Sequence, residues 1–280
     1  MKNFLRFYSI TPLFLSLVTR TPGMNRTMLN STQAIFVLAL LSARSLAADS
    51  SSEAPVFKDK ILEKAVRKFV FDKRDNDKPI VETDVVNLST IQGVGMEIAD
   101  LSGLEKCANL ASLDLSKNKI KDLTPLKGLG KLQYLNLADN QIEDIAPLAE
   151  DMALQYVELS NNQITDISPI VKLPRMASLY LDNNHLTSIA GVGGLGSLTT
   201  LSLNHNTISD IASLDGLTNL FYLFLENNKI RDLTPLVKMA KKDFENEKRF
   251  APFLNLYVKG NSTKGSQKAQ LKDYGVRLND

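Results

Sequence analysis

The chain has 280 residues, of which 44% are apolar and 23% are charged, a composition that is ordinary for a globular protein with a sizeable core. Its formal net charge of +2 depends on residues 1–47, which hold five basic residues and no acidic ones. The remaining 28 basic and 31 acidic residues leave the rest of the chain at about −3. A mildly acidic chain without a basic run offers no electrostatic basis for binding nucleic acid, so we exclude that class of partner.

The first segment, residues 1–47, has the pattern of a targeting sequence. Arg26 precedes an apolar run at residues 34–41, and a small-residue site ending at Ala47 comes before a polar stretch. This order is typical of a secretory signal, and the apolar run is too short to span a bilayer. A second apolar patch upstream indicates that synthesis starts at Met24, and an uncleaved anchor built from both patches is the alternative. We therefore expect export to a periplasmic, extracellular or cell-surface location, with no stable membrane span after cleavage.

A polar linker at residues 48–56 is followed by an N-terminal helical cap at residues 57–87. Apolar residues recur between Phe57 and Val70 at steps of three and four, and charged residues fill the other positions. This spacing predicts an amphipathic helix. Because a stack of repeats needs its first apolar coil covered, we expect the helix to lie over the open end of the stack.

Residues 88–261 repeat a unit of 22 residues. A degenerate first coil at residues 88–109 precedes six full repeats, and one asparagine marks each full repeat without a slip. These residues are Asn118, Asn140, Asn162, Asn184, Asn206 and Asn228. Self-similarity of this kind predicts a solenoid of stacked coils.

The period breaks after the sixth repeat. The next equivalent asparagine, Asn261, lies 33 residues after Asn228 instead of 22, so 11 residues are inserted within residues 239–252. The inserted residues are mostly charged and predict a helix or a long turn. A terminal coil ends at Asn261, and residues 262–280 are expected to form a C-terminal cap with a short helix and a final strand.

The positions within each repeat predict its local structure. The Leu-x-x-Leu-x-Leu segment predicts a short strand with one buried face, and successive copies stack in parallel. The asparagine amide both donates and accepts hydrogen bonds, so its column is expected to form a ladder at the turns. The Asp-Leu-Thr-Pro-Leu segment at residues 122–126 predicts one helical turn, with Thr124 as N-cap and Pro125 at the first helical position.

A column of aspartates precedes these turns. It comprises Asp100, Asp122, Asp144, Asp166, Asp210 and Asp232. We expect the carboxylates to bond the free N–H groups of the turns that follow them. Calcium binding is disfavoured, because the spacings of EF-hands and of glycine-rich calcium rolls are absent.

The 22-residue unit, Leu-x-x-Leu-x-Leu-x-x-Asn-x-Ile-x-Asp-Ile-x-Pro-Leu, and the cap containing Phe57-x-Asp59-x-x-Leu62 resemble the leucine-rich repeat region of bacterial internalin-like proteins. The resemblance covers about residues 55–261. It implies an α/β solenoid: a gently curved leucine-rich repeat array with a parallel concave sheet and short helical turns on the convex side. It also implies that the concave face binds partner proteins. The sequence holds neither an immunoglobulin-like module nor a Leu-Pro-x-Thr-Gly sorting signal, so host-cell invasion is not implied.

In such a sheet, the residues that flank the strand leucines point out of the concave face. Aromatic residues are concentrated there, acids are interspersed, and basic side chains are nearly absent. Exposed aromatics match the composition of interface hot spots, although stacking along the strands alone is the alternative. The acidic character favours a neutral or basic partner surface. The predicted partner-binding residues are Tyr134, Tyr156, Glu158, Tyr180, Phe221, Tyr222, Phe224 and Tyr257.

Catalytic signatures are missing from the sequence. His185 and His205 lie in adjacent coils but lack a third ligand of metal-site type, and Cys107 is expected to be a buried apolar residue. We therefore predict a protein-binding module that has no enzymatic activity, no cofactor and no metal. Two alternatives stay open: an intracellular scaffold resembling the phosphatase-regulating repeat proteins, and carbohydrate binding through the exposed aromatics.

Overall fold

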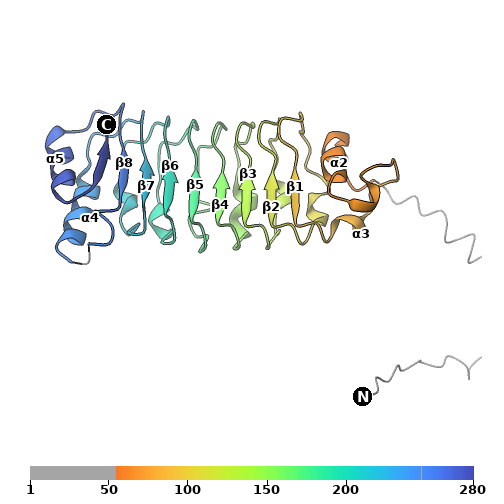
Figure 1. Ribbon diagram of the computed structural model, residues 1–280. Helices are drawn as coiled ribbons and strands as arrows, with labels where there is room; N and C mark the ends of the chain where they lie inside the picture. The colour runs from red at the N-terminus through yellow and green to blue at the C-terminus, as the bar shows by residue number, and fades with distance from the viewer. Residues whose placement is uncertain (1–54, 247) are drawn as a thin grey trace, which may run out of the picture. The chain divides into compact units, whose positions relative to one another are not determined.

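The computed structural model describes residues 55–246 and 248–280, which form a single stack of coils around a nine-stranded parallel sheet (Figure 1). The strand order along the sheet is the order along the chain, from β1 to β9. This arrangement confirms the predicted solenoid. The predicted targeting segment and most of the predicted linker lie outside the described residues.

Each strand is three residues long, and the central residue of β1 to β8 is buried. Pairing is in register throughout, so that residues at the same repeat position become neighbours. The strands are β1 (Thr90–Gln92), β2 (Ser112–Asp114), β3 (Tyr134–Asn136), β4 (Tyr156–Glu158), β5 (Ser178–Tyr180), β6 (Thr200–Ser202), β7 (Tyr222–Phe224), β8 (Asn255–Tyr257) and β9 (Arg277–Asn279).

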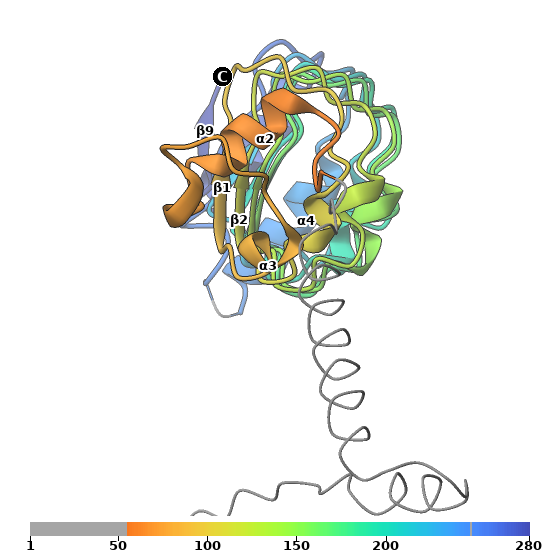
Figure 2. The ribbon, with the colours of Figure 1, turned by 90° about the vertical axis from the view of Figure 1, so that its right-hand side faces the viewer.

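Short helical turns lie on the side of the stack opposite the sheet, as Figure 2 shows in a view along the stack. Leucines and isoleucines from the strands and from these turns fill the space between the two layers. The turns are η2 (Leu104–Lys106), η3 (Thr124–Leu126), η4 (Ala146–Glu150), η5 (Val192–Gly194) and η6 (Ala212–Leu214), and the N-terminal cap holds a further turn, η1 (Phe71–Lys73).

The carboxylates of the aspartate column accept hydrogen bonds at these turns. The turn η3 begins one residue earlier than predicted. Thr124 does not cap η3, because it is the first residue of that turn and Pro125 is the second. The capping acceptor is Asp122, whose carboxylate accepts hydrogen bonds from the Thr124 backbone N–H at 2.8 Å and from its hydroxyl. The same bond to the N–H two residues on is made by Asp100, Asp144, Asp166, Asp210 and Asp232. The predicted turn-stabilising role of the aspartates is therefore confirmed.

Helices cover both ends of the stack (Figure 1). At the N-terminal end lie α2 (Lys60–Arg67) and α3 (Glu82–Val85), and at the C-terminal end lie α4 (Thr234–Phe244) and α5 (Gly265–Asp273). Asp59 caps α2 by accepting the Ile61 N–H at 2.7 Å, and its other oxygen accepts the Ala99 N–H of the first coil at 3.0 Å. One carboxylate thus joins the cap to the repeats.

The asparagine column forms the expected ladder, and its members are buried. The Asn162 Nδ2 donates to the carbonyl of Leu159 in its own coil at 2.9 Å and to that of Leu137 in the preceding coil at 3.0 Å. Its Oδ1 accepts the Ile142 N–H of the preceding coil at 3.0 Å. Each amide therefore satisfies backbone groups of two coils that have no access to water.

Asp151 occupies a position at which the other full repeats and the first coil have an apolar residue. The equivalent residues are Cys107, Leu129, Leu173, Leu195, Leu217 and Met239, and all are buried. Asp151 is itself fully buried, and its carboxylate oxygens have no hydrogen-bond partner among the described residues. Burial raises the pKa of Asp151 to about 6. An acid in a leucine column therefore weakens the third coil at neutral pH.

We expect Asn162→Ala to lower the free energy of unfolding by about 2–4 kcal/mol, because it strands buried backbone groups in two coils. Chemical unfolding followed by circular dichroism measures this loss. Gln163→Ala is the matched control, since that neighbouring side chain is exposed. Equal stability of the two variants would contradict the role of the ladder.

Asp151→Asn should raise the free energy of unfolding at pH 7 by about 2–3 kcal/mol, because it removes the buried charge. This is the free energy that corresponds to a pKa raised from the normal range to about 6 in the folded state. Because the native state holds the proton more tightly than the unfolded state, wild-type stability falls as the pH rises from about 4 to about 6. The gain from the variant should therefore vanish near pH 4. Chemical unfolding curves recorded between about pH 4 and pH 7 measure this gain, and Glu143→Gln, at an exposed residue, is the control. A gain that does not depend on pH would refute the raised pKa of Asp151.

Candidate functional site

The solvent-facing side of the sheet, here called the concave face, carries two columns of side chains. They are the first and third residues of each strand, and the register places each beside its equivalents in the neighbouring strands. All the predicted partner-binding residues belong to these columns except Phe221, which immediately precedes β7. The structure divides the aromatic residues of this face into two groups.

The first group is the tyrosine ladder, formed by Tyr134, Tyr156 and Tyr180. The rings of Tyr134 and Tyr156 stack with centroids 4.7 Å apart and planes inclined by 11°. Tyr180 is in register with Glu158, yet its ring lies 5.4 Å from that of Tyr156. All three side chains are half-buried. Burial, and next the nearby Glu158, raise the pKa of Tyr156 to about 12, so its hydroxyl stays protonated at neutral pH.

The second group is the C-terminal aromatic cluster, which consists of Phe221, Tyr222, Phe224, Phe253 and Tyr257. Phe224 stacks on Tyr257 with centroids 4.5 Å apart, and on Tyr222 with centroids 6.2 Å apart. Phe221 and Phe253 meet edge to face at 6.5 Å. Phe221, Tyr222 and Phe253 are 46%, 45% and 48% exposed. Strand β6 offers only Thr200 and Ser202 to the concave face and separates this cluster from the tyrosine ladder.

Carboxylates between and beside the rings are held in place by hydrogen bonds. Glu158 accepts the Ser160 N–H at 2.8 Å, and Asp182 accepts the Ser202 hydroxyl at 2.6 Å and the Asn204 N–H at 2.8 Å. Burial raises the pKa of Glu158, and the nearby Asp182 and Asp139 raise it further. The middle of the concave face is therefore a fixed, negatively charged surface.

Sequence reasoning missed two residues of this face, Phe253 and Arg277. The repeat pattern places Phe253 at the anchor position, where its six equivalents are all buried. Phe253 is turned outward because Leu254 and Phe250 fill the core in the terminal coil. Arg277 lies 22 residues after Asn255, so the repeat frame does reach it, and it is the one basic residue of the two columns.

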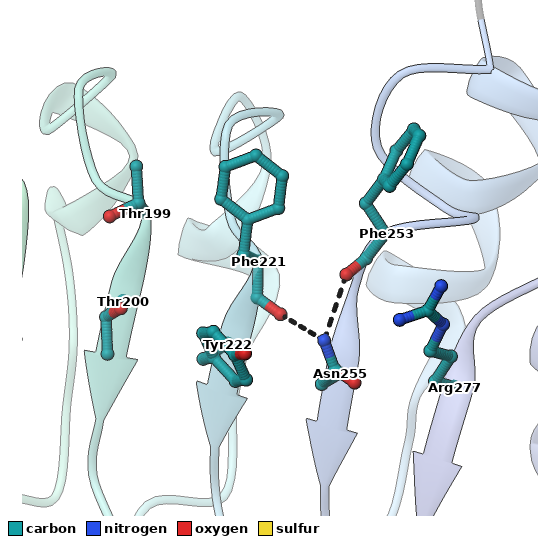
Figure 3. Close-up of a pocket in the computed structure, with 7 residues that line it drawn as sticks. All are labelled: Thr199, Thr200, Phe221, Tyr222, Phe253, Asn255 and Arg277. Atoms are coloured by element: carbon teal, nitrogen blue, oxygen red, sulfur yellow. Dashed lines mark hydrogen bonds between the residues drawn. The ribbon is translucent and has the colours of Figure 1, made fainter.

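These two residues help to line a cavity of about 230 Å³ where β6 to β9 begin (Figure 3). Asn255 stands at its centre and donates from Nδ2 to the backbone carbonyls of Phe221 and Phe253, at 3.0 and 3.1 Å. The lining residues are Thr199, Thr200, Phe221, Tyr222, Phe253, Asn255 and Arg277.

The remaining candidates for chemistry are not brought together. His205 contacts Asn227 at 3.2 Å, and no group of three or more His, Cys, Asp or Glu side chains in residues 55–246 and 248–280 is arranged to hold a metal ion. Burial raises the pKa of Cys107 to about 12, which keeps it a thiol at neutral pH. None of the described helices is long and apolar enough to cross a membrane.

Comparison with known proteins agrees with this architecture. A family model for two-copy leucine-rich repeats matches residues 108–150 and 153–193, and a second leucine-rich repeat model matches residues 174–230. No curated protein matches the chain in sequence.

Solved structures provide the closer comparisons. Internalin C2 from Listeria monocytogenes is 29% identical over 80% of this chain and 92% of its own, with a TM-score of 0.69. An internalin F structure from the same species is 23% identical over 82% of this chain and 79% of its own, with a TM-score of 0.49. A leucine-rich repeat protein from Leptospira interrogans is 21% identical over 65% of this chain and 57% of its own, with a TM-score of 0.51. The matched repeats, the capped solenoid and the likeness to internalin C2 lead to one conclusion: this chain is an internalin-like leucine-rich repeat protein.

Proposed function

We propose that this protein is exported and binds another protein through its concave face without catalysing a reaction. Leucine-rich repeat proteins in general mediate protein–protein interactions. The observation that carries the proposal for this chain is the pair of aromatic groups, the tyrosine ladder and the C-terminal aromatic cluster, held on one face of a continuous sheet.

Preorganisation supports the choice of this face. Six of the eight rings stand on strands that are paired in register on both sides, Phe221 and Phe253 immediately precede such strands or lie two residues before them, and every ring contacts another ring. Side chains that are already ordered lose little conformational entropy when a partner binds. Large, half-exposed aromatic side chains also supply most of the apolar area that hot spots bury.

The ring geometry favours a protein over a carbohydrate partner. A sugar ring stacks on an open aromatic face, whereas the stacked rings of Tyr134 and Tyr156 each cover one face of the other. Phe224 and Tyr257 do the same, with planes inclined by 20°. The fixed carboxylates beside the tyrosine ladder favour neutral or basic partner residues in that half of the face, and this attraction should weaken with added salt.

We expect replacement of either aromatic group to weaken binding of a purified partner, captured from native extract, by about 30-fold or more, the loss typical of hot-spot residues. The two variants are Tyr156→Ala with Tyr180→Ala, and Phe221→Ala with Tyr222→Ala. The control is Phe71→Ala with Met152→Ala, which removes exposed apolar side chains elsewhere on the protein. Surface plasmon resonance measures the affinities. Full affinity in both concave variants would refute the proposed face.

Export makes a separate prediction. Mass spectrometry of the protein purified from its native source should give a mature N-terminus at Ala48, the residue after the predicted cleavage site. A cytosolic protein that retains Met1 or Met24 would favour the intracellular scaffold instead.

A further inference from the structure

The cavity at the start of β6 to β9 differs in kind from the rest of the concave face. Four of its residues form one in-register row across four strands: Thr200, Tyr222, Asn255 and Arg277. Phe221 and Phe253 rise beside this row, as Figure 3 shows. Its walls are therefore aromatic, while its far end carries a guanidinium.

The walls are fixed in position. The Asn255 amide holds the backbones of Phe221 and Phe253 through two hydrogen bonds, and the two rings also contact each other edge to face. The Oδ1 of Asn255 accepts no hydrogen bond from a described residue, which leaves a free acceptor in the lining of the cavity. This is a ready-made polar contact for an incoming N–H group.

Arg277 is exposed and forms no ion pair with any described residue. Elsewhere the concave face is negative, with Asp114 held on β2 and with Glu158 and Asp182 held at the middle strands. A ligand carboxylate would be repelled over those strands and attracted at Arg277. A guanidinium is also suited to bidentate binding of a carboxylate.

The size of the cavity limits what can occupy it. Its volume of about 230 Å³ is below the range of roughly 300–1,000 Å³ that is usual for sites of whole drug-sized ligands. A single large side chain of a docked protein fits this volume better than a complete small molecule does. Exposed rings at the rim and an arginine at the edge are also the residue types enriched in interface hot spots.

We infer that this cavity is an anchor pocket for one aromatic side chain of the protein partner, with the carboxylate of an adjacent aspartate or glutamate bound by Arg277. The inference rests on the proposed function and adds the chemistry of one contact to it. The aromatic side chain packs against Phe221, Tyr222 and Phe253. The partner is thereby oriented, with an acidic residue over β9 and neutral or basic residues over the tyrosine ladder.

The test titrates the full-length exported protein with short capped peptides and follows backbone amide resonances by NMR. The probes are acetyl-Asp-Phe-amide, its neutral match acetyl-Asn-Phe-amide, and acetyl-Asp-Ala-amide, which lacks the ring. We expect the Asp-Phe probe to shift the resonances of Phe221, Asn255 and Arg277 in a saturable way. Each of the other two probes should bind roughly fivefold more weakly, since it lacks either the charge or the ring.

Arg277→Gln should lower the affinity for the Asp-Phe probe to that for the Asn-Phe probe and leave the affinity for the Asn-Phe probe unchanged. Arg277→Lys should keep part of the difference in affinity between the two probes. Arg231→Gln, which removes an exposed arginine outside the two columns, is the matched control. Equal losses for both probes, equal binding of both probes to wild type, or no saturable shift would each overturn the pocket. Tighter binding of acetyl-phenylalanine with a free carboxylate would also overturn it, in favour of a chain terminus.

These outcomes are separate from the affinity experiment on the aromatic groups. The peptide titration needs no identified partner. If the peptides do not bind in the pocket, the affinity of the partner for the tyrosine-ladder variant still tests the concave-face proposal. Conversely, if the concave variants retain their partner while the Asp-Phe probe still binds to the wild-type pocket, the proposed function fails together with the anchoring of that partner, and only the affinity of the pocket for the Asp-Phe probe stands.

Discussion

A buried side-chain amide that bonds two coils at once is the constraint on which this structure depends. The Nδ2 of Asn162 donates to carbonyls of its own coil and of the one before, and its Oδ1 accepts an N–H of the earlier coil. Repeated along the stack, this bond fixes each coil against its neighbour with no sliding. The residue before each asparagine of the full repeats accepts a left-handed backbone, with φ between 52° and 59°, so that the amide can reach both coils.

Because the ladder fixes the register, residues 22 apart in the sequence become neighbours on the sheet. The columns of the concave face could therefore be predicted from sequence alone. The ring contacts could not, since they depend on side-chain rotamers: Tyr180 is paired with Glu158 yet its ring approaches that of Tyr156. The start of η3 was also predicted one residue too late. Asp122 accepts the hydrogen bond of the Thr124 N–H, so Thr124 is the first residue of the turn and does not cap it.

The remaining surprises lie where the repeat is interrupted. The insertion before the terminal coil brings Phe250 into the core and turns Phe253 out, although the pattern assigns the anchor position to Phe253. Counting repeats forward would have reached Arg277, but its place beside these rings follows only from the packing of the cap. The repeat frame likewise reveals Asp151 in a leucine column, whereas its full burial and raised pKa required the structure.

A perfectly regular scaffold would leave a partner free to shift by one coil, because the next strand, about 4.8 Å away, would present the same side chains. The departures from the repeat remove that freedom. Strand β6 interrupts the aromatic surface, the fixed carboxylates lie on one side of it, and the cavity with Arg277 lies on the other. A partner whose charges and apolar side chains match this order fits in one position only. Specificity on this scaffold thus comes from the residues that do not repeat, while the residues that do repeat hold them at fixed spacing.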